Sequence, residues 1–352
     1  MLRLWMRHEV RPTERRAPIV PDDAGRLVER GIALTVEDSP QRVFPIPDYA
    51  AAGCAIAEPG SWTAASDDHY VIGLKELPDL PAALRHRHVF FGHAFKEQRG
   101  ARTLLRRFAA GGGMLLDTEH LVDSEGRRLA AFGYRAGYVG AALAVLHLRD
   151  QLETPLRCLP KAVLDDALRR PHRGAALRAL VIGALGRGGR GARDALATAA
   201  IAPTCWDVAE TRQLDRTALL GHDLLVNTVL RTHPVPPFLT DADLAESTRR
   251  LILISDVTCD VTSASNALPI YDSITTWEQP VRRLRVGLPP RDILAIDNLP
   301  SLLPKEASRA FSAELVPNLM TLGSATPTWR RCEHAFHKAC VSTGIQGESA
   351  DV

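Results

Sequence analysis

Two stretches of the sequence place ionisable side chains directly after an apolar run. The segment VIGLKELP, residues 71–78, leads from apolar residues to Lys75 and Glu76 and then stops at a proline. The segment HVFFGHAFKEQ, residues 88–98, repeats this order with His93. Burial can bring the pKa values of lysine and histidine towards neutrality, where these side chains exchange protons with a substrate. Both segments are therefore candidates for an acid–base site.

Further charged and polar side chains of the N-terminal region could belong to the same site. They are Arg16, Glu76, Lys96, Gln98, Glu119, Arg127 and Arg128. Taken singly, such residues are more often solvated surface groups or members of salt bridges. Guanidinium groups bind carboxylates through two hydrogen bonds, so Arg16 and Arg128 indicate an acidic substrate. For Arg127 and Arg128 an exposed turn is the alternative interpretation.

A glycine-rich turn in the middle of the chain could bind a dinucleotide. The segment VIGALGRGGRGA, residues 181–192, does not match G-x-G-x-x-G, because two residues separate Gly183 from Gly186. A strand that leads through bare glycines into a helix still lets backbone N–H groups approach a pyrophosphate. Asp207, about 20 residues on, stands where an acid binds the adenosine ribose and disfavours NADP. A capped turn without a ligand is the alternative, and the combination of strand, helix and aspartate favours NAD.

The composition indicates an ordinary globular protein of two domains. The chain has 352 residues, of which 45% are hydrophobic and 24% are charged, and domains usually have about 100–200 residues. The formal net charge of +2 gives no reason to expect a nucleic-acid partner or a membrane surface. The expected partner is a small molecule. The sequence does not decide the oligomeric state and is compatible with a monomer.

Helical and strand patterns alternate along the chain and predict an α/β fold. Residues 21–31 have the pattern of a short helix, and residues 32–40 that of a strand. This order predicts mostly parallel sheets covered by helices on both faces, whose ligands collect at the carboxyl ends of the strands. Lys75 and His93 both fall at predicted strand ends. Residues 132–152, rich in small side chains, predict a long helix that connects the two domains.

Cysteine usage and the absence of targeting patterns indicate a cytoplasmic protein. The six cysteines are scattered without a C-x-x-C pair, which argues against a disulfide framework or a zinc site, so we expect no metal. The N-terminus lacks the apolar core of a signal peptide. The most apolar stretch, residues 138–148, is too short to span a bilayer.

Ten segments, in one order over nearly the whole chain, resemble the lysine-forming, NAD-dependent saccharopine dehydrogenases. Alanine dehydrogenase and transhydrogenase are more distantly similar. The segments are RPTERRAPIVP, VEDSPQRVFPIPDYAAAGC, GSW, VIGLKELP, GHAFKEQ, GRRLAAFGYRAGYVGAAL, VIGALGRGGRGA, CWDVAET, SDVTCDVTSASNALPIY and IDNLPSLLPKEAS. The resemblance implies two Rossmann-like domains facing across a cleft. Residues 1–132 with 308–352 would form the substrate domain, and residues 133–307 the NAD domain.

The resemblance also implies a reaction: the reversible cleavage of saccharopine, with NAD and water, to L-lysine, 2-oxoglutarate and NADH. Lys75 would take a proton from the substrate's secondary amine, and His93 would serve water addition to the imine and collapse of the carbinolamine. Glu76 and Glu119 match the acids that tune these two groups. The positions that match substrate-binding residues are Arg16, Lys75, Gln98, Arg128, Phe132, Thr258, Cys259 and Asp260. The positions that match the dinucleotide site are Arg127, Gly183, Gly186, Arg187, Asp207, Thr211, Val257, Ile296, Asp297, Asn298 and Leu299.

The sequence departs from the family's pattern at several places. Gly188 and Thr228 replace two cysteines of fungal members, and Leu230 replaces a tyrosine of the cofactor site. Residues 258–268 lack the usual proline–histidine pair, and residues 281–292 are shorter than expected. These departures leave the identity of the substrate more open than the type of reaction.

Three alternatives to saccharopine dehydrogenase remain open. An opine-type imine reductase would join a different amine to a 2-oxo acid. A catalytically silent module would sense NADH or an amino acid, although intact Lys75 and His93 argue against it. Alanine dehydrogenase activity is less favoured, because GLKELP and IDNLPSLLPKEAS follow the saccharopine pattern more closely.

Overall fold

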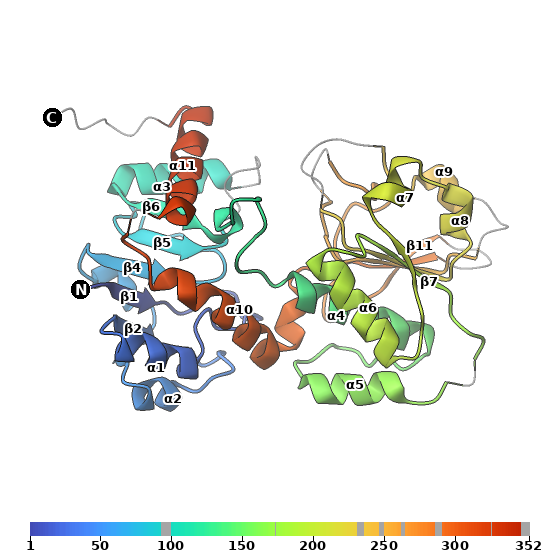
Figure 1. Ribbon diagram of the computed structural model, residues 1–352, viewed down its shortest axis with the longest axis horizontal. Coiled ribbons are helices and arrows are strands. Elements are labelled where there is room, and N and C mark those ends of the chain that lie inside the picture. Colours follow the sequence, from blue (N-terminus) through green and yellow to red (C-terminus); the bar gives the residue numbers. More distant parts are fainter. Residues whose placement is uncertain are drawn as a thin grey trace. The chain divides into compact units, whose positions relative to one another are not determined.

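The chain folds into two compact units (Figure 1). Unit 1 comprises Met1–Ala131 and Pro304–Val352, and unit 2 comprises Phe132–Leu303. The computed structural model describes residues 1–92, 100–172, 174–230, 236–245, 250–261, 265–285, 291–324 and 326–345. Each unit is built around its own sheet.

Unit 1 contains a six-stranded parallel sheet in the order β3-β2-β1-β4-β5-β6. Its strands are β1 (Arg3–Met6), β2 (Ala33–Glu37), β3 (Ala55–Ala57), β4 (His69–Ile72), β5 (Arg87–Phe90) and β6 (Met114–Asp117). The helices are α1 (Pro21–Glu29), α2 (Ile46–Ala51), α3 (Ala101–Gly111), α10 (Pro304–Leu319) and α11 (Pro327–Ser342), with short 3-10 turns η1 (Ser61–Ala64) and η2 (Thr118–His120). The C-terminal helices return to this unit, where α10 packs on α1 and α11 on β6 (Figure 1). The strand order reverses between β1 and β4.

Unit 2 contains a second six-stranded sheet, in the order β11-β12-β10-β9-β7-β8. Its strands are β7 (Ala179–Ile182), β8 (Thr204–Trp206), β9 (Leu224–Asn227), β10 (Leu253–Asp256), β11 (Arg282–Arg285) and β12 (Arg291–Leu294). The helices are α4 (Gly133–Leu148), α5 (Lys161–Arg169), α6 (Arg187–Thr198), α7 (Val208–Arg212), α8 (Arg216–Leu220) and α9 (Asp241–Ala245), with the 3-10 turn η3 (Leu299–Leu302). All neighbours are parallel except the edge strand β11. The strand order reverses between β7 and β9.

Small residues allow α4 and α6 to pack with their backbones in contact. A Cβ atom on Gly137 would lie 1.8 Å from the Gly188 carbonyl oxygen, and one on Gly191 would lie 1.9 Å from the Tyr134 carbonyl oxygen. The long helix predicted from small residues is therefore a buried core helix of unit 2, with its last helical residue at Leu148.

The α/β prediction is confirmed, with two mostly parallel, Rossmann-like sheets. Strand β4 ends at Ile72, and the chain bends after Gly73, at Leu74 and Lys75. Helix α5 and strands β11 and β12 were not predicted. Within the described part of the chain, no helix is long and apolar enough to cross a bilayer.

A fully buried histidine lies in the aromatic core of unit 1. His88, on β5, is 0% exposed, and neither of its ring nitrogens has a hydrogen-bond partner among the residues that the structure describes. Its ring packs edge-on against Trp62, with centroids 5.1 Å apart, and Phe108, with centroids 5.3 Å apart. Burial, reinforced by the charge of Arg7, places the pKa of His88 well below its ordinary value. His88 is therefore neutral in the folded protein.

We predict that replacing His88 by leucine removes a source of acid sensitivity. Below pH 6.5 the unfolded chain protonates this histidine and the folded chain does not, so the wild type loses stability as the pH falls. The loss relative to His88→Leu should approach about 1.4 kcal/mol per pH unit. Urea unfolding between pH 7.5 and 5 measures it, with exposed His334→Gln as the control. Equal pH slopes for wild type and His88→Leu would contradict the interpretation.

Candidate functional site

Lys75 lies at the carboxyl edge of the unit 1 sheet, as the sequence predicted. It follows the last residue of β4 by three positions, and β4 lies between β1 and β5. His93 follows the end of β5 by three positions in the sequence, but it lies outside the described residues, as do Lys96 and Gln98. Glu119 follows β6 within η2. Parallel strands end at one edge, so the ends of β1, β4, β5 and β6 all lie on the same side of the sheet.

Two buried charged residues that follow β1 hold the backbone around Lys75. The Glu9 carboxylate accepts hydrogen bonds from the Leu74 N–H at 2.7 Å and the Lys75 N–H at 3.0 Å. The Arg7 guanidinium donates to the Lys75 carbonyl oxygen. Sequence reasoning missed Arg7 and Glu9, because their partners lie more than 60 positions away and no local pattern marks them.

Glu76 forms a bidentate pair with Arg11. The two N–O distances are 2.9 Å from Nε and 3.1 Å from Nη2. Burial tends to raise the pKa of the Glu76 carboxyl, but hydrogen bonds from Arg11 and the charge of Lys75 outweigh it and hold this pKa below its ordinary value. Glu76 is therefore ionised at neutral pH, next to Lys75 in the sequence, where its charge can influence the protonation of that amine.

Arg16 is buried and paired with a carboxylate of its own loop. Its Nε and Nη2 atoms lie 2.8 and 2.6 Å from the oxygens of Glu14, and the two residues are 3% and 1% exposed. The positive charge of Arg16, which was expected to bind a substrate carboxylate, is thus paired with Glu14. A carboxylate ligand would have to share or replace this interaction.

The loop after β6 contains a second paired arginine and a perturbed carboxyl group. Arg128 donates to Glu119 at 2.9 Å. Asp117 accepts hydrogen bonds from the N–H groups of Gly92, at 3.1 Å, and Glu119, at 2.8 Å. Burial, together with the charge of Glu119, raises the pKa of Asp117 to about 7. This carboxyl group, which sequence reasoning missed, fixes the backbone immediately before His93.

Arg127 lies on an exposed turn. It is paired with Asp123 at 2.9 Å and Glu125 at 2.7 Å, and 70% of its side chain is exposed. Within unit 1, Arg127 therefore has the environment of an exposed turn, which was the alternative interpretation of this position.

In unit 2, the glycine-rich turn joins β7 to α6 as predicted. Gly183 has a φ of +80°, and a Cβ there would lie 2.7 Å from both Thr228 Oγ1 and Val229 Cγ2. Gly186 is the N-cap of α6, and Arg187 is its first residue. The turn therefore presents the N-terminus of a twelve-residue helix with little side-chain cover, which suits an anionic group.

Asp207 connects this turn to the end of β8. Its carboxylate accepts from the Leu185 N–H and the Val208 N–H, both at 2.9 Å, and its carbonyl accepts from the Thr211 hydroxyl at 2.8 Å. Leu185 and Val208 are 72% and 60% exposed. Such apolar side chains, beside an acid that the sequence predicts to bind a ribose, suit the flat face of an adenine. Sequence reasoning missed both, although a leucine within a glycine turn was a visible signal.

The remaining predicted positions of unit 2 follow β10 and β12. The Asp256 carboxylate accepts from Thr258 Oγ1 at 2.7 Å, Tyr271 Oη at 2.7 Å and Asn227 Nδ2 at 3.0 Å, which fixes the loop that carries Val257 to Asp260. Burial raises the pKa of the Cys259 thiol well above its ordinary value, so the thiol is protonated. The segment from Ile296 to Leu299 leads from β12 into η3, and Asn298 adopts a left-handed conformation with a φ of 69°.

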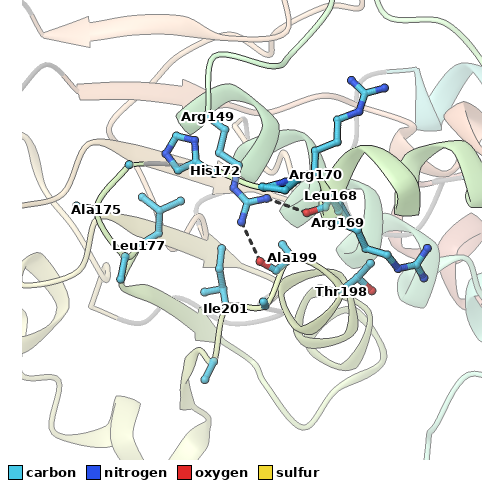
Figure 2. Close-up of a pocket in the computed structure, with 15 residues that line it drawn as sticks. Arg149, Leu168, Arg169, Arg170, His172, Ala175, Leu177, Thr198, Ala199 and Ile201 are labelled. Carbon is cyan, nitrogen blue, oxygen red and sulfur yellow. Dashed lines mark hydrogen bonds between the residues drawn. The ribbon is translucent and has the colours of Figure 1, made fainter.

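A pocket of about 520 Å³ lies elsewhere in unit 2 (Figure 2). Its lining includes Leu177 and Ala202, which precede β7 and β8, so it opens at the amino edge of the sheet. Arg149 donates to the carbonyl oxygens of Leu168 and Ala199, both at 2.8 Å, and thereby caps the ends of α5 and α6 (Figure 2). Basic side chains at helix C-termini stabilise the helix dipole. This pocket contains none of the predicted site residues.

Among the residues that the structure describes, no three His, Cys, Asp or Glu side chains gather closely enough to hold a metal ion. The described groups are of the types that exchange protons and bind carboxylates at the carboxyl edge of unit 1, and of the type that binds an anionic group at that of unit 2.

Comparison with known proteins identifies the family. Residues 5–139 match the family described as "Alanine dehydrogenase/PNT, N-terminal domain". The chain is 38% identical to "Saccharopine dehydrogenase (NAD(+), L-lysine-forming)" of Schizosaccharomyces pombe, over 95% of this chain and 97% of that protein. It is 36% identical to the protein of the same name from Yarrowia lipolytica, over 97% and 99% of the two chains. The fold matches that of a solved L-alanine dehydrogenase with a TM-score of 0.65 and 16% identity, over 96% of this chain and 94% of that one. The chain belongs to the family of NAD-dependent, L-lysine-forming saccharopine dehydrogenases.

Proposed function

We propose that this protein catalyses the reversible, NAD-dependent cleavage of saccharopine to L-lysine and 2-oxoglutarate. The observation that carries the proposal is the near full-length similarity to saccharopine dehydrogenases, together with Lys75 and Glu76 at the carboxyl edge of the unit 1 sheet. Unit 1 would supply proton transfer and carboxylate binding, and unit 2 the dinucleotide site.

The residues of unit 2 fit a dinucleotide. Glycines surround the N-terminus of α6. Its chain neighbours apart, a Cβ at Gly186 would meet one atom of the described residues within 4 Å, the Gly183 carbonyl oxygen at 3.3 Å, which leaves room for a pyrophosphate at the backbone. Asp207 would bind the adenosine ribose, with Leu185 and Val208 against the adenine. Bound NAD supplies the hydride acceptor, and every other step falls to the protein and water.

Lys75 would begin the cleavage by taking the proton from the secondary amine of saccharopine. Loss of that proton lets the nitrogen lone pair form the imine as hydride leaves the adjacent carbon. His93 would then deprotonate water as it adds to the imine carbon. Finally His93 would return its proton to the nitrogen while the hydroxyl proton of the carbinolamine leaves to water, and the carbon–nitrogen bond would break to release lysine and the 2-oxo acid. Arg16 and Arg128 would bind substrate carboxylates by sharing or exchanging their present partners, Glu14 and Glu119.

The first prediction concerns the substrate. In the direction of saccharopine formation, NADH oxidation should require both 2-oxoglutarate and L-lysine. A panel of other amines at equal concentration should give much lower kcat/KM values. No turnover with lysine, combined with turnover of another amine, would favour the opine-type alternative and overturn the proposal.

The second prediction concerns the proton-transfer group. Lys75→Met should lower kcat at least ~100-fold, because a positioned acid–base group contributes about 10²–10⁴ to the rate. The affinity for NADH, measured by fluorescence titration, should stay within about twofold, since the dinucleotide is assigned to unit 2. The matched control is Lys305→Met, which removes an exposed lysine on α10. Wild-type turnover in Lys75→Met would exclude Lys75 from the chemistry.

The third prediction concerns the choice of dinucleotide. Asp207→Asn should weaken NADH binding by about tenfold or more, because a charge-assisted hydrogen bond to a ribose contributes roughly 1.5–3 kcal/mol. Binding of NADPH should weaken less, since the variant no longer repels the 2′-phosphate. Asp215→Asn, at the N-cap of α8, serves as the control. Unchanged NADH affinity in Asp207→Asn would show that this carboxylate only shapes the turn.

A further inference from the structure

The backbone on both sides of Lys75 is held by side chains that come from another strand end. Glu9 accepts from the Leu74 N–H at 2.7 Å and from the Lys75 N–H at 3.0 Å. Arg7 donates to the Lys75 carbonyl oxygen and, at 3.0 Å, to the His8 carbonyl oxygen. The N–H and the C=O of Lys75 are therefore both bound to charged side chains.

Arg7 and Glu9 also interact with each other in the interior of unit 1. Arg7 Nη1 lies 3.4 Å from Glu9 Oε2, and the two residues are 1% and 4% exposed. The Arg7 guanidinium lies over the Phe90 ring, 5.6 Å from its centroid. Burying such a pair carries a large desolvation penalty, so its presence alone is weak evidence for a role in stability. What distinguishes this pair is the target of its hydrogen bonds, the peptide groups around Lys75.

Gly73 makes room for this arrangement. A Cβ at Gly73 would lie 2.5 Å from Arg7 Nε and 2.6 Å from Arg7 Cζ. The Gly73 N–H still donates to the Val89 carbonyl oxygen at 3.0 Å, so the sheet continues to this point. Since φ at Gly73 is not positive, the position needs glycine for space and not for backbone conformation.

We propose that Arg7 and Glu9, with the space left by Gly73, are positioning residues that fix the point from which the Lys75 side chain projects. The inference rests on the function proposed above for Lys75. Neither residue acts on the substrate; each acts through the main chain of Lys75. A displacement of about 1 Å in a catalytic group can cost about 10²-fold in rate, so a clamp on the backbone at this position has a direct effect on turnover.

The test begins with Gly73→Ala, in which the new methyl group displaces the Arg7 guanidinium while Arg7, Glu9 and Lys75 all remain. We expect kcat to fall about 10- to 100-fold, while NADH affinity stays within about twofold of the wild type. The control is Gly25→Ala in α1, where a Cβ would make ordinary contacts at 3.8 Å or more and should leave kcat unchanged. Glu9→Gln is the second variant, because an amide offers only one acceptor to the two N–H groups.

The deciding readout is the effect of each change in a Lys75→Met background. A residue that acts through Lys75 should lower kcat in the wild type and cause no further loss in Lys75→Met, so the two effects are not additive. Wild-type kcat in folded Gly73→Ala and Glu9→Gln would overturn the proposal. Losses of kcat that add fully to the loss caused by Lys75→Met would also overturn it. A fall in melting temperature together with a fall in NADH affinity would do the same, because each of these results indicates a structural role. A wild-type enzyme without turnover would instead overturn the proposed function.

Discussion

Carboxylates that accept backbone N–H groups hold the loops at the carboxyl edges of both sheets. Where a parallel strand ends, its neighbour's N–H groups lose their ladder partners, and buried N–H groups need acceptors. Glu37, the last residue of β2, accepts from the N–H groups of His8, Gly60 and Trp62 at 2.6–2.9 Å. Glu9 does the same for the turn after β4. The loops that carry the candidate site depend on these buried acceptors.

Carboxyl groups accept backbone N–H groups in the same way at other loops of the two carboxyl edges. Asp117 holds the backbone after β5, Asp207 holds the glycine turn after β7, and Asp256 holds the loop after β10. Each carboxylate comes from the end of a strand and reaches a loop that carries a predicted site residue. The chain therefore uses buried carboxyl groups to hold the backbone of the loops that carry predicted site residues, and proton transfer requires such a fixed geometry.

The fold class and the positions of several site residues at strand ends could be predicted from the sequence, because strand and helix periodicity are local signals. The patterns placed Lys75 at a strand end and Asp207 beyond the glycine turn, and the parallel order followed from the alternation of elements. The contacts of Glu9 and Asp117 could not be predicted, because they join segments 65 and 25 positions apart and leave no periodic signal. The pairing of Arg16 with Glu14 was missed for another reason: a sequence shows that an arginine is present but not which carboxylate it meets. The roles of all the predicted site residues stay predictions, and His93, Lys96 and Gln98 also lie outside the described residues.

A Lys75 that acts as the base at neutral pH must lose its proton there, and its protonation can be observed directly. The chain has only five lysines, at positions 75, 96, 161, 305 and 338, so an NMR titration of protein with ¹³Cε-labelled lysine would give five resolvable signals. The signal that disappears in Lys75→Met identifies this residue. In the enzyme saturated with NAD, we expect this signal to titrate at a lower pH than the other four. A midpoint at or above the ordinary lysine value of about 10.4 would contradict it.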